Sequence, residues 1–143
     1  MWTGHNLTSA LSACLLAATL GQAVCLNDHP SVPEEYKTAK AVVTATVLTE
    51  RIILSSGDRF YDGTVYRISV DKVFRGHLGS RAEIFSDSSG RFPMTVGAKY
   101  LLFIHAASGR TQVDNCGNSG LFSQRGTELQ QVERLAAKRR GTS

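Results

Sequence analysis

The chain is poor in the residues that build metal centres and catalytic sites. It has three cysteines and four histidines in 143 residues, and no histidine has a His or Cys partner at the spacing of a metal-binding motif. No set of nucleophile, general base and metal ligands can be recognised in the sequence. We therefore expect a protein without a metal, without a cofactor and without enzymatic activity.

The start of the chain lacks charge. Residues 1–23 contain no Lys, Arg, Asp or Glu, and Leu7–Leu20 is apolar and rich in small residues. Gly21 and Ala23 place small residues at positions −3 and −1 of a cut after Ala23, which is typical of a signal peptide. The apolar run is short for a transmembrane span. We expect residues 1–23 to be removed on export and the protein to be secreted or periplasmic.

A second interpretation of this leader stays open. Leu11-Ser12-Ala13-Cys14 resembles the lipid-attachment box of bacterial lipoproteins, and a lipid on Cys14 would hold the protein at a membrane surface. The segment ahead of the apolar run carries His5 but neither Lys nor Arg, which departs from the usual leader.

Removal of 23 of the 143 residues leaves 120, enough for one domain with one good core. We place this domain at residues 24–140, followed by a short tail at 141–143. All of the net charge of +4 lies in this part, and most of the basic residues are scattered. Only Arg134 and Lys138–Arg140 cluster, where cations favour the C-terminal end of a helix dipole. Contact of this cluster with an acidic partner or a membrane surface is the alternative.

Two cysteines remain after such a cut, Cys25 near its start and Cys116 in a late turn. Because exported domains keep disulfides, we expect these two sulfur atoms to be bonded. A bridge between these two cysteines closes a loop of about 90 residues, which stabilises a fold by roughly 4–5 kcal/mol in the loop-entropy model. The alternative is a free Cys116 thiol packed as a small hydrophobe. The neighbouring Asp114 and Asn115 are interpreted as turn formers rather than as partners of a catalytic thiol.

Helices are expected at both ends of the domain. Ser31 and Glu34 form a capping box before a short helix that runs to about Ala39. Thr127 and Gln130 form a second capping box before a C-terminal helix with one apolar stripe.

Between these helices, β-branched and alternating apolar residues predict five strands, at 41–54, 64–74, 81–86, 100–104 and 111–114. Turns are expected at 55–58 and at Asp62-Gly63. The 100–104 strand is apolar on both faces and should be the most buried, with His105 at its solvated end. The pattern predicts a mostly β fold, a five-stranded Greek-key barrel of the OB type with a short N-terminal helix and a C-terminal helix. A two-sheet sandwich would need about seven strands.

Six motifs then follow one another along the chain, namely Cys25, Pro33–Tyr36, Ala41–Val47, Tyr66–Val70 with Phe74–Gly76, Val96–Phe103 and Cys116–Ser119. In this order they resemble the tissue-inhibitor-of-metalloproteinase-like, or netrin-type (NTR), domains over about residues 25–137. The resemblance implies an OB barrel with flanking helices, export, and a bridge from an N-terminal cysteine to a late loop.

The resemblance also implies a non-enzymatic module that binds another protein. In the true inhibitors a Cys-x-Cys segment begins the mature chain, and the amine and carbonyl of its first cysteine chelate the zinc of a metalloprotease. Here the segment is Cys25-Leu26-Asn27, so the second cysteine is absent, and a cut after Ala23 leaves Val24 in front of the amine. Metalloendopeptidase inhibition is therefore a candidate activity that requires an exposed Cys25.

A second candidate contact surface comes from Phe60 and Tyr61, an aromatic pair between two expected turns. The alternative function is an OB-fold domain that binds an oligosaccharide or oligonucleotide through stacking aromatics and basic grooves. Nucleic acid is not expected as the main ligand of an exported protein. The identity of the partner and the oligomeric state stay open.

Overall fold

The computed structural model describes most of the domain and little of what precedes it. The described part comprises Cys25, residues 29–55, Gly57 and residues 61–141. The expected signal peptide at 1–23, the lipid site at Cys14 and three candidate contact residues lie outside the described residues; these three are Leu26, Asn27 and Phe60.

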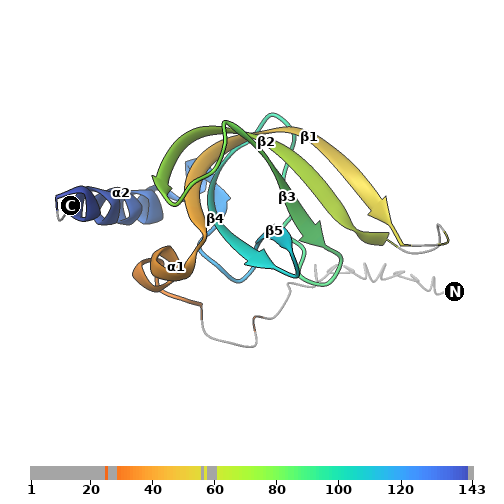
Figure 1. The fold of residues 1–143 in the computed structure, drawn as a ribbon, viewed down its shortest axis with the longest axis horizontal. Coiled ribbons are helices and arrows are strands. Elements are labelled where there is room, and N and C mark those ends of the chain that lie inside the picture. The colour runs from red at the N-terminus through yellow and green to blue at the C-terminus, as the bar shows by residue number, and fades with distance from the viewer. Residues whose placement is uncertain (1–24, 26–28, 56, 58–60, 142–143) are drawn as a thin grey trace, which may run out of the picture.

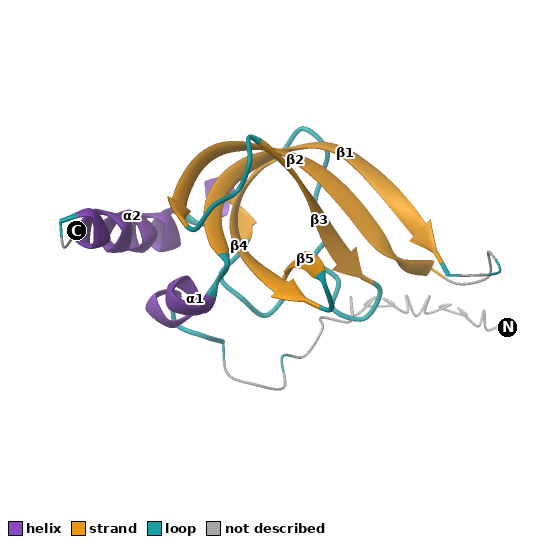
Figure 2. Ribbon diagram, in the orientation of Figure 1, coloured by secondary structure: helices purple, strands orange, loops and turns teal. Residues whose placement is uncertain are grey.

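The described elements are two α-helices, a short 3-10 helix and six strands that form one sheet (Figures 1 and 2). In chain order they are α1 (Val32–Thr38), β1 (Ala41–Leu54), β2 (Tyr61–Arg75), β3 (Arg81–Asp87), β4 (Lys99–Ala107), β5 (Arg110–Val113), β6 (Gly120–Leu121), η1 (Phe122–Gln124) and α2 (Gly126–Arg140). The protein is therefore mostly β with a helix near each end of the domain, as expected.

The sheet has the order β1-β2-β3-β5-β4-β6, and β1 also pairs with β4. The strand pairings thus run from β1 through β2, β3, β5 and β4 back to β1, and Figure 2 shows the sheet curling accordingly. All pairs are antiparallel except β3 with β5. The sequence predicted five strands within this part of the chain, whereas the structure has six. The additional strand is the two-residue β6, whose Leu121 lies opposite Tyr100.

Two apolar clusters lie on the two faces of the curled sheet. The first fills its inside with alternate residues of the strands, among them Val43, Ile68 and Leu102. The second lies between the other face and the two helices, and it includes Phe103 of β4 and Val132 of α2. Because β1 and β4 contact both clusters, they are apolar on both faces. Residues 100–104 are all buried, which confirms the expectation for this strand.

The two helix starts differ from each other. At α1 both halves of the expected capping box are present, since Glu34 N–H donates to Ser31 Oγ and the Glu34 carboxylate accepts from Ser31 N–H. The expected box at Thr127 is wrong. The helix α2 begins at Gly126 after Arg125, without a side-chain cap, and Leu129 N–H already donates to the Arg125 carbonyl at 2.9 Å. The turn η1 leads directly into the helix, so Thr127 lies inside its first turn.

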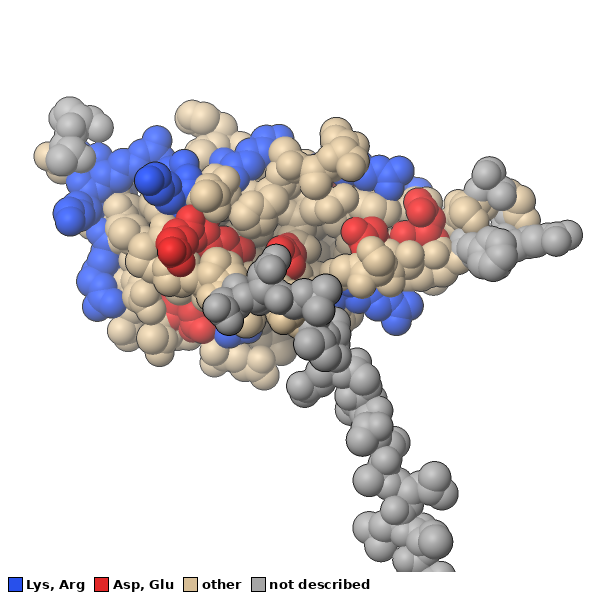
Figure 3. Space-filling view, turned by 90° about the horizontal axis from the view of Figure 1, so that it is seen from below, with Lys and Arg blue, Asp and Glu red and all other residues tan. Residues whose placement is uncertain are grey.

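The C-terminal basic residues lie where a helix dipole favours them. Lys138, Arg139 and Arg140 occupy the last turn of α2. Figure 3 shows Lys and Arg side chains gathered at the end of the molecule where Figure 1 places this helix. Among the described residues, no helix is both long enough and apolar enough to cross a membrane.

One half of β1 extends beyond β4. Its pairing with β2 runs from Val42 to Leu54, but only Ala41–Thr46 pairs with β4. The expected turn at Asp62-Gly63 is also wrong, because both residues lie inside β2, where Gly63 faces Ile53 of β1. The two long strands consequently form a hairpin that projects from the rest of the sheet (Figure 1).

Candidate functional site

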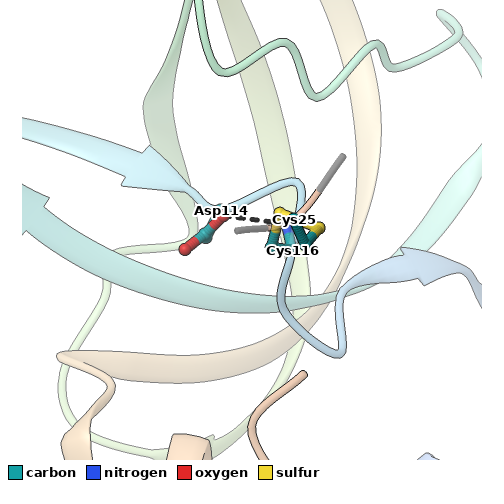
Figure 4. The surroundings of a disulfide bond; sticks show 3 residues. All are labelled: Cys25, Asp114 and Cys116. Carbon is teal, nitrogen blue, oxygen red and sulfur yellow. Dashed lines mark hydrogen bonds between the residues drawn. A yellow bond between two sulfur atoms is a disulfide. The ribbon is translucent and has the colours of Figure 1, made fainter. Parts of the chain in front are cut away.

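The start of the domain is covalently bonded to the loop that follows β5. Cys25 and Cys116, which are 91 positions apart in the sequence, form a disulfide with their Cα atoms 5.7 Å apart (Figure 4). The expected pairing is present, and Cys116 is not a free thiol. Asp114 acts as a turn former, as expected, because its Oδ1 accepts a 2.8 Å hydrogen bond from Cys116 N–H.

A buried carboxylate holds the same loop against α1. Glu35 is 3% exposed. Its Oε2 accepts hydrogen bonds from Asn118 N–H at 2.6 Å and from Asn118 Nδ2 at 2.7 Å. The same Nδ2 donates to the Pro30 carbonyl at 2.9 Å. The side chain of Asn118 therefore bridges Glu35 of α1 and Pro30, which precedes this helix.

Two further residues fix the loop from either side. Gly117 lies so close to Glu35 that a Cβ atom at this position would collide with the carboxylate oxygen Oε1. On the far side, the buried Ser119 accepts a 2.8 Å hydrogen bond from Phe103 N–H of β4 through its Oγ. The loop is consequently held by the disulfide, by α1 and by the most buried strand.

His105 belongs to this network rather than to a solvated strand end, which corrects the expectation from the sequence. Its Nε2 lies 3.2 Å from Glu35 Oε1, and its side chain is only 30% exposed. The hydrogen bond to Glu35 raises the pKa of His105, and the negative charges of Glu35 and Asp114 act in the same direction, while partial burial opposes them. The sequence did not reveal the partner because Glu35 is 70 positions away.

The arrangement is suited to holding a backbone segment in place. The sulfur of Cys116 is bonded, so it is not available as a nucleophile in this state. Within the part of the chain that the structure describes, no three His, Cys, Asp or Glu side chains are grouped to hold a metal.

Tyr61, the described member of the aromatic pair, is half-buried. Its hydroxyl lies 2.7 Å from Thr64 Oγ1, and the guanidinium of Arg91 lies 4.9 Å from its ring centroid. The structure does not bring Tyr61 to the disulfide loop, and Phe60 lies outside the described residues.

Sequence reasoning found Cys25, Cys116 and Asp114 but missed Glu35 and Asn118. The position of Glu35 on the helix could have indicated its role. Glu35 stands three positions after Val32 and four before Ala39, on the inward face of α1, where an acid requires partners.

No model of a known protein family matches this chain, and a search of curated proteins found none that is similar to it.

Proposed function

We propose that the chain is an exported, non-enzymatic module that binds another protein through the start of its mature domain. The observation that carries the proposal is the Cys25–Cys116 disulfide. It bonds the start of the domain to the loop after β5, and Glu35 holds this loop by accepting a hydrogen bond from Asn118 N–H. The loop at residues 116–119, to which Cys25 is bonded, is held by the disulfide and by hydrogen bonds, and a surface held in this way loses little conformational entropy when it binds. Metalloendopeptidase inhibition is the special case that the likeness to tissue inhibitors of metalloproteinases suggests.

An OB-type barrel is part of the same proposal. The support for it is the return of the strand pairings from β4 to β1, together with the parallel pair of β3 and β5. The two helices cover one outer face, and Cys25 is bonded to the loop that follows β5.

The inhibitor special case depends on one chemical group, the amine of Cys25. A free amine with its neighbouring carbonyl can chelate a zinc ion, whereas an amide nitrogen behind Val24 cannot act in this way. The second cysteine of the inhibitors has Asn27 in its place here, so the rigidity has to come from the single bridge and the Glu35 network.

The oligosaccharide or oligonucleotide alternative receives less support. Such ligands stack on exposed aromatic faces. In the described part of the chain, five rings each have a cation over one face, namely Tyr36, Tyr61, Phe74, Phe85 and Phe122. These faces are already occupied by cations, which disfavours the stacking of a base or a sugar on them.

The inhibitor special case is tested with three forms of the purified chain: one starting at Cys25, one starting at Val24, and the first with its amine acetylated. Each is titrated against a zinc metalloendopeptidase that cleaves a fluorogenic peptide. We expect only the free Cys25 amine to inhibit. Equal inhibition by all three forms, or by none, contradicts the chelation mechanism.

The broader proposal is tested separately by placing a photo-crosslinking amino acid at position 26 in the producing organism, with position 130 on α2 as the control. Crosslinking of a defined protein from position 26 alone supports the proposal. The absence of any crosslink from position 26, or the same product from both positions, overturns it.

A further inference from the structure

Four neighbouring strands place one row of side chains on the face of the sheet opposite the first core cluster. Arg51 of β1 lies opposite Val65 of β2, Val65 lies opposite Phe85 of β3, and Phe85 lies opposite Gln112 of β5. Arg110, two residues before Gln112, shares the same face. Between the two arginines the surface is hollowed into a cleft of about 340 Å³. This volume falls in the range of ligand sites.

The floor of this cleft is apolar and held in place. A Cβ atom at Gly63 would lie 2.7 Å from Cζ of Phe85, so the missing side chain is what lets the ring lie across β2. Ile53, opposite Gly63 on β1, and Val65 continue the floor. Phe85 is 8% exposed, and the guanidinium of Arg110 lies over its ring, 4.1 Å from the ring centroid.

The cleft has cationic groups at both ends. Arg51 is exposed, and no acid of the described residues forms an ion pair with it. Arg110 has a long 3.7 Å contact with Asp62, and both side chains are about half exposed, so this pair is weak. Glu83, which lines the cleft, pairs with Arg67 at 3.3 Å, and both of these side chains are also about half exposed, so this pair is weak as well.

We propose that this cleft, which uses none of the residues of the N-terminal site, binds an extended acidic peptide segment of a partner protein. Adjacent strands are about 4.8 Å apart, so the backbones of β1 and β5 are separated by three spacings, or roughly 14 Å. In an extended peptide, residues four apart are roughly 13 Å apart and point to the same side. Two acids in this relation reach Arg51 and Arg110, and the residue midway between them rests on the aliphatic side chain of Val65.

The chemistry of the floor separates a peptide from a stacking ligand. A nucleobase or a sugar ring would need a free aromatic face. The exposed face of Phe85 is taken by Arg110, which leaves aliphatic contacts and two guanidinium groups. Guanidinium groups bind carboxylates in a bidentate manner, and an aliphatic side chain is the natural complement of the floor.

The probe is a fluorescently labelled peptide, acetyl-Glu-Ser-Leu-Ser-Glu-amide, titrated with the purified chain and followed by fluorescence anisotropy. We expect saturable binding that weakens at least tenfold when both acids of the peptide are replaced by Gln. Arg51→Gln should weaken binding about tenfold, because a charge-assisted contact is lost. Asp62→Asn should strengthen it several-fold, because Arg110 loses its competing partner.

The matched control is Arg134→Gln, which makes the same charge change on the exposed surface of α2. It should leave binding within a factor of two. Arg110→Gln would uncover Phe85 and so could lower the stability of the fold as well as peptide binding. The test therefore uses Arg51→Gln and Asp62→Asn. The proposal is overturned if Arg51→Gln and Arg134→Gln weaken peptide binding by the same factor. It is also overturned if the neutral peptide binds as tightly as the acidic one, or if the acidic peptide does not bind at millimolar concentration. Tighter binding of a DNA oligonucleotide at the same arginines also overturns it.

Discussion

Glu35 Oε2 on α1 accepts two hydrogen bonds from Asn118, one from its main-chain N–H at 2.6 Å and one from its side-chain Nδ2 at 2.7 Å. The two residues are 83 positions apart, so this contact joins the first helix to the loop after β5. Because the disulfide partner Cys116 lies two residues before Asn118, the covalent bridge and the buried carboxylate stabilise the same loop.

Replacing this carboxylate should therefore destabilise the whole domain. In Glu35→Gln the amide oxygen can still accept from Asn118, but an NH2 group replaces the oxygen beside His105 Nε2 and the negative charge that strengthens these buried hydrogen bonds is lost. We expect a cost of about 1–3 kcal/mol. Urea unfolding measures this loss as a decrease in the free energy of unfolding. Glu50→Gln removes an exposed acid of β1 and is the control, with an expected change below about 0.5 kcal/mol. Equal stability of the two variants would mean that the Glu35 contacts contribute little.

The tight packing of Gly117 against Glu35 gives a second prediction. Gly117→Ala places a methyl group on the carboxylate oxygen, so either the loop or the helix has to move. We expect a lower melting temperature and a loss of about 1–3 kcal/mol. The matched substitution is Gly126→Ala in the first turn of α2, where a Cβ atom meets nothing within 4 Å and alanine favours the helix. This variant should be as stable as the parent protein or more so, and the reverse order of the two variants would contradict the packing argument.

The parts of this fold that sequence could predict are those that depend on local patterns. The β-branched residues of 41–54 indicated a long strand, the apolar run 100–104 indicated a strand with two buried faces, and the Ser31–Glu34 pair indicated a helix start. The Thr127 capping box failed because a tight turn after β6 already began the helix at Gly126. A motif of four residues carries no information about where the preceding segment ends.

The site was harder to predict because its contacts are long-range. The two cysteines could be paired, since few alternatives exist in a chain with so few thiols. The pairing of Glu35 with Asn118 and His105 depends on how β4, the loop and α1 meet in space. Gly63 was taken for a turn residue, whereas its real role is to leave room for the ring of Phe85 from a neighbouring strand.

The disulfide itself should account for a large share of the stability. In the loop-entropy model a bridge between residues 91 positions apart stabilises the fold by roughly 4–5 kcal/mol. We expect Cys116→Ser to lose about 2–5 kcal/mol, measured by thermal and urea unfolding. The reduced wild-type protein is the control and should lose a similar amount. An unchanged melting temperature in both samples, or two free thiols in the unreduced protein, would show that the bridge does not stabilise the domain.

The His105–Glu35 pair should make stability depend on pH in a defined direction. The pKa of His105 is raised in the folded protein, first by the hydrogen bond to Glu35, so the folded state holds its proton more tightly than the unfolded state does. The resulting stabilisation is fully present below the unfolded pKa of about 6.5 and is lost as the pH rises through the higher folded pKa. His105→Gln keeps a donor for Glu35 but cannot carry the charge.

The free energy of unfolding of both proteins is measured in urea from acidic to mildly alkaline pH. The advantage of the parent over His105→Gln should be largest at the acidic end and should shrink as the pH rises. His77→Gln, which removes an exposed histidine outside this network, should retain the pH dependence of the parent. If His105→Gln retains it as well, or if the advantage grows with pH, then the protonated imidazole does not bind Glu35 in the folded protein.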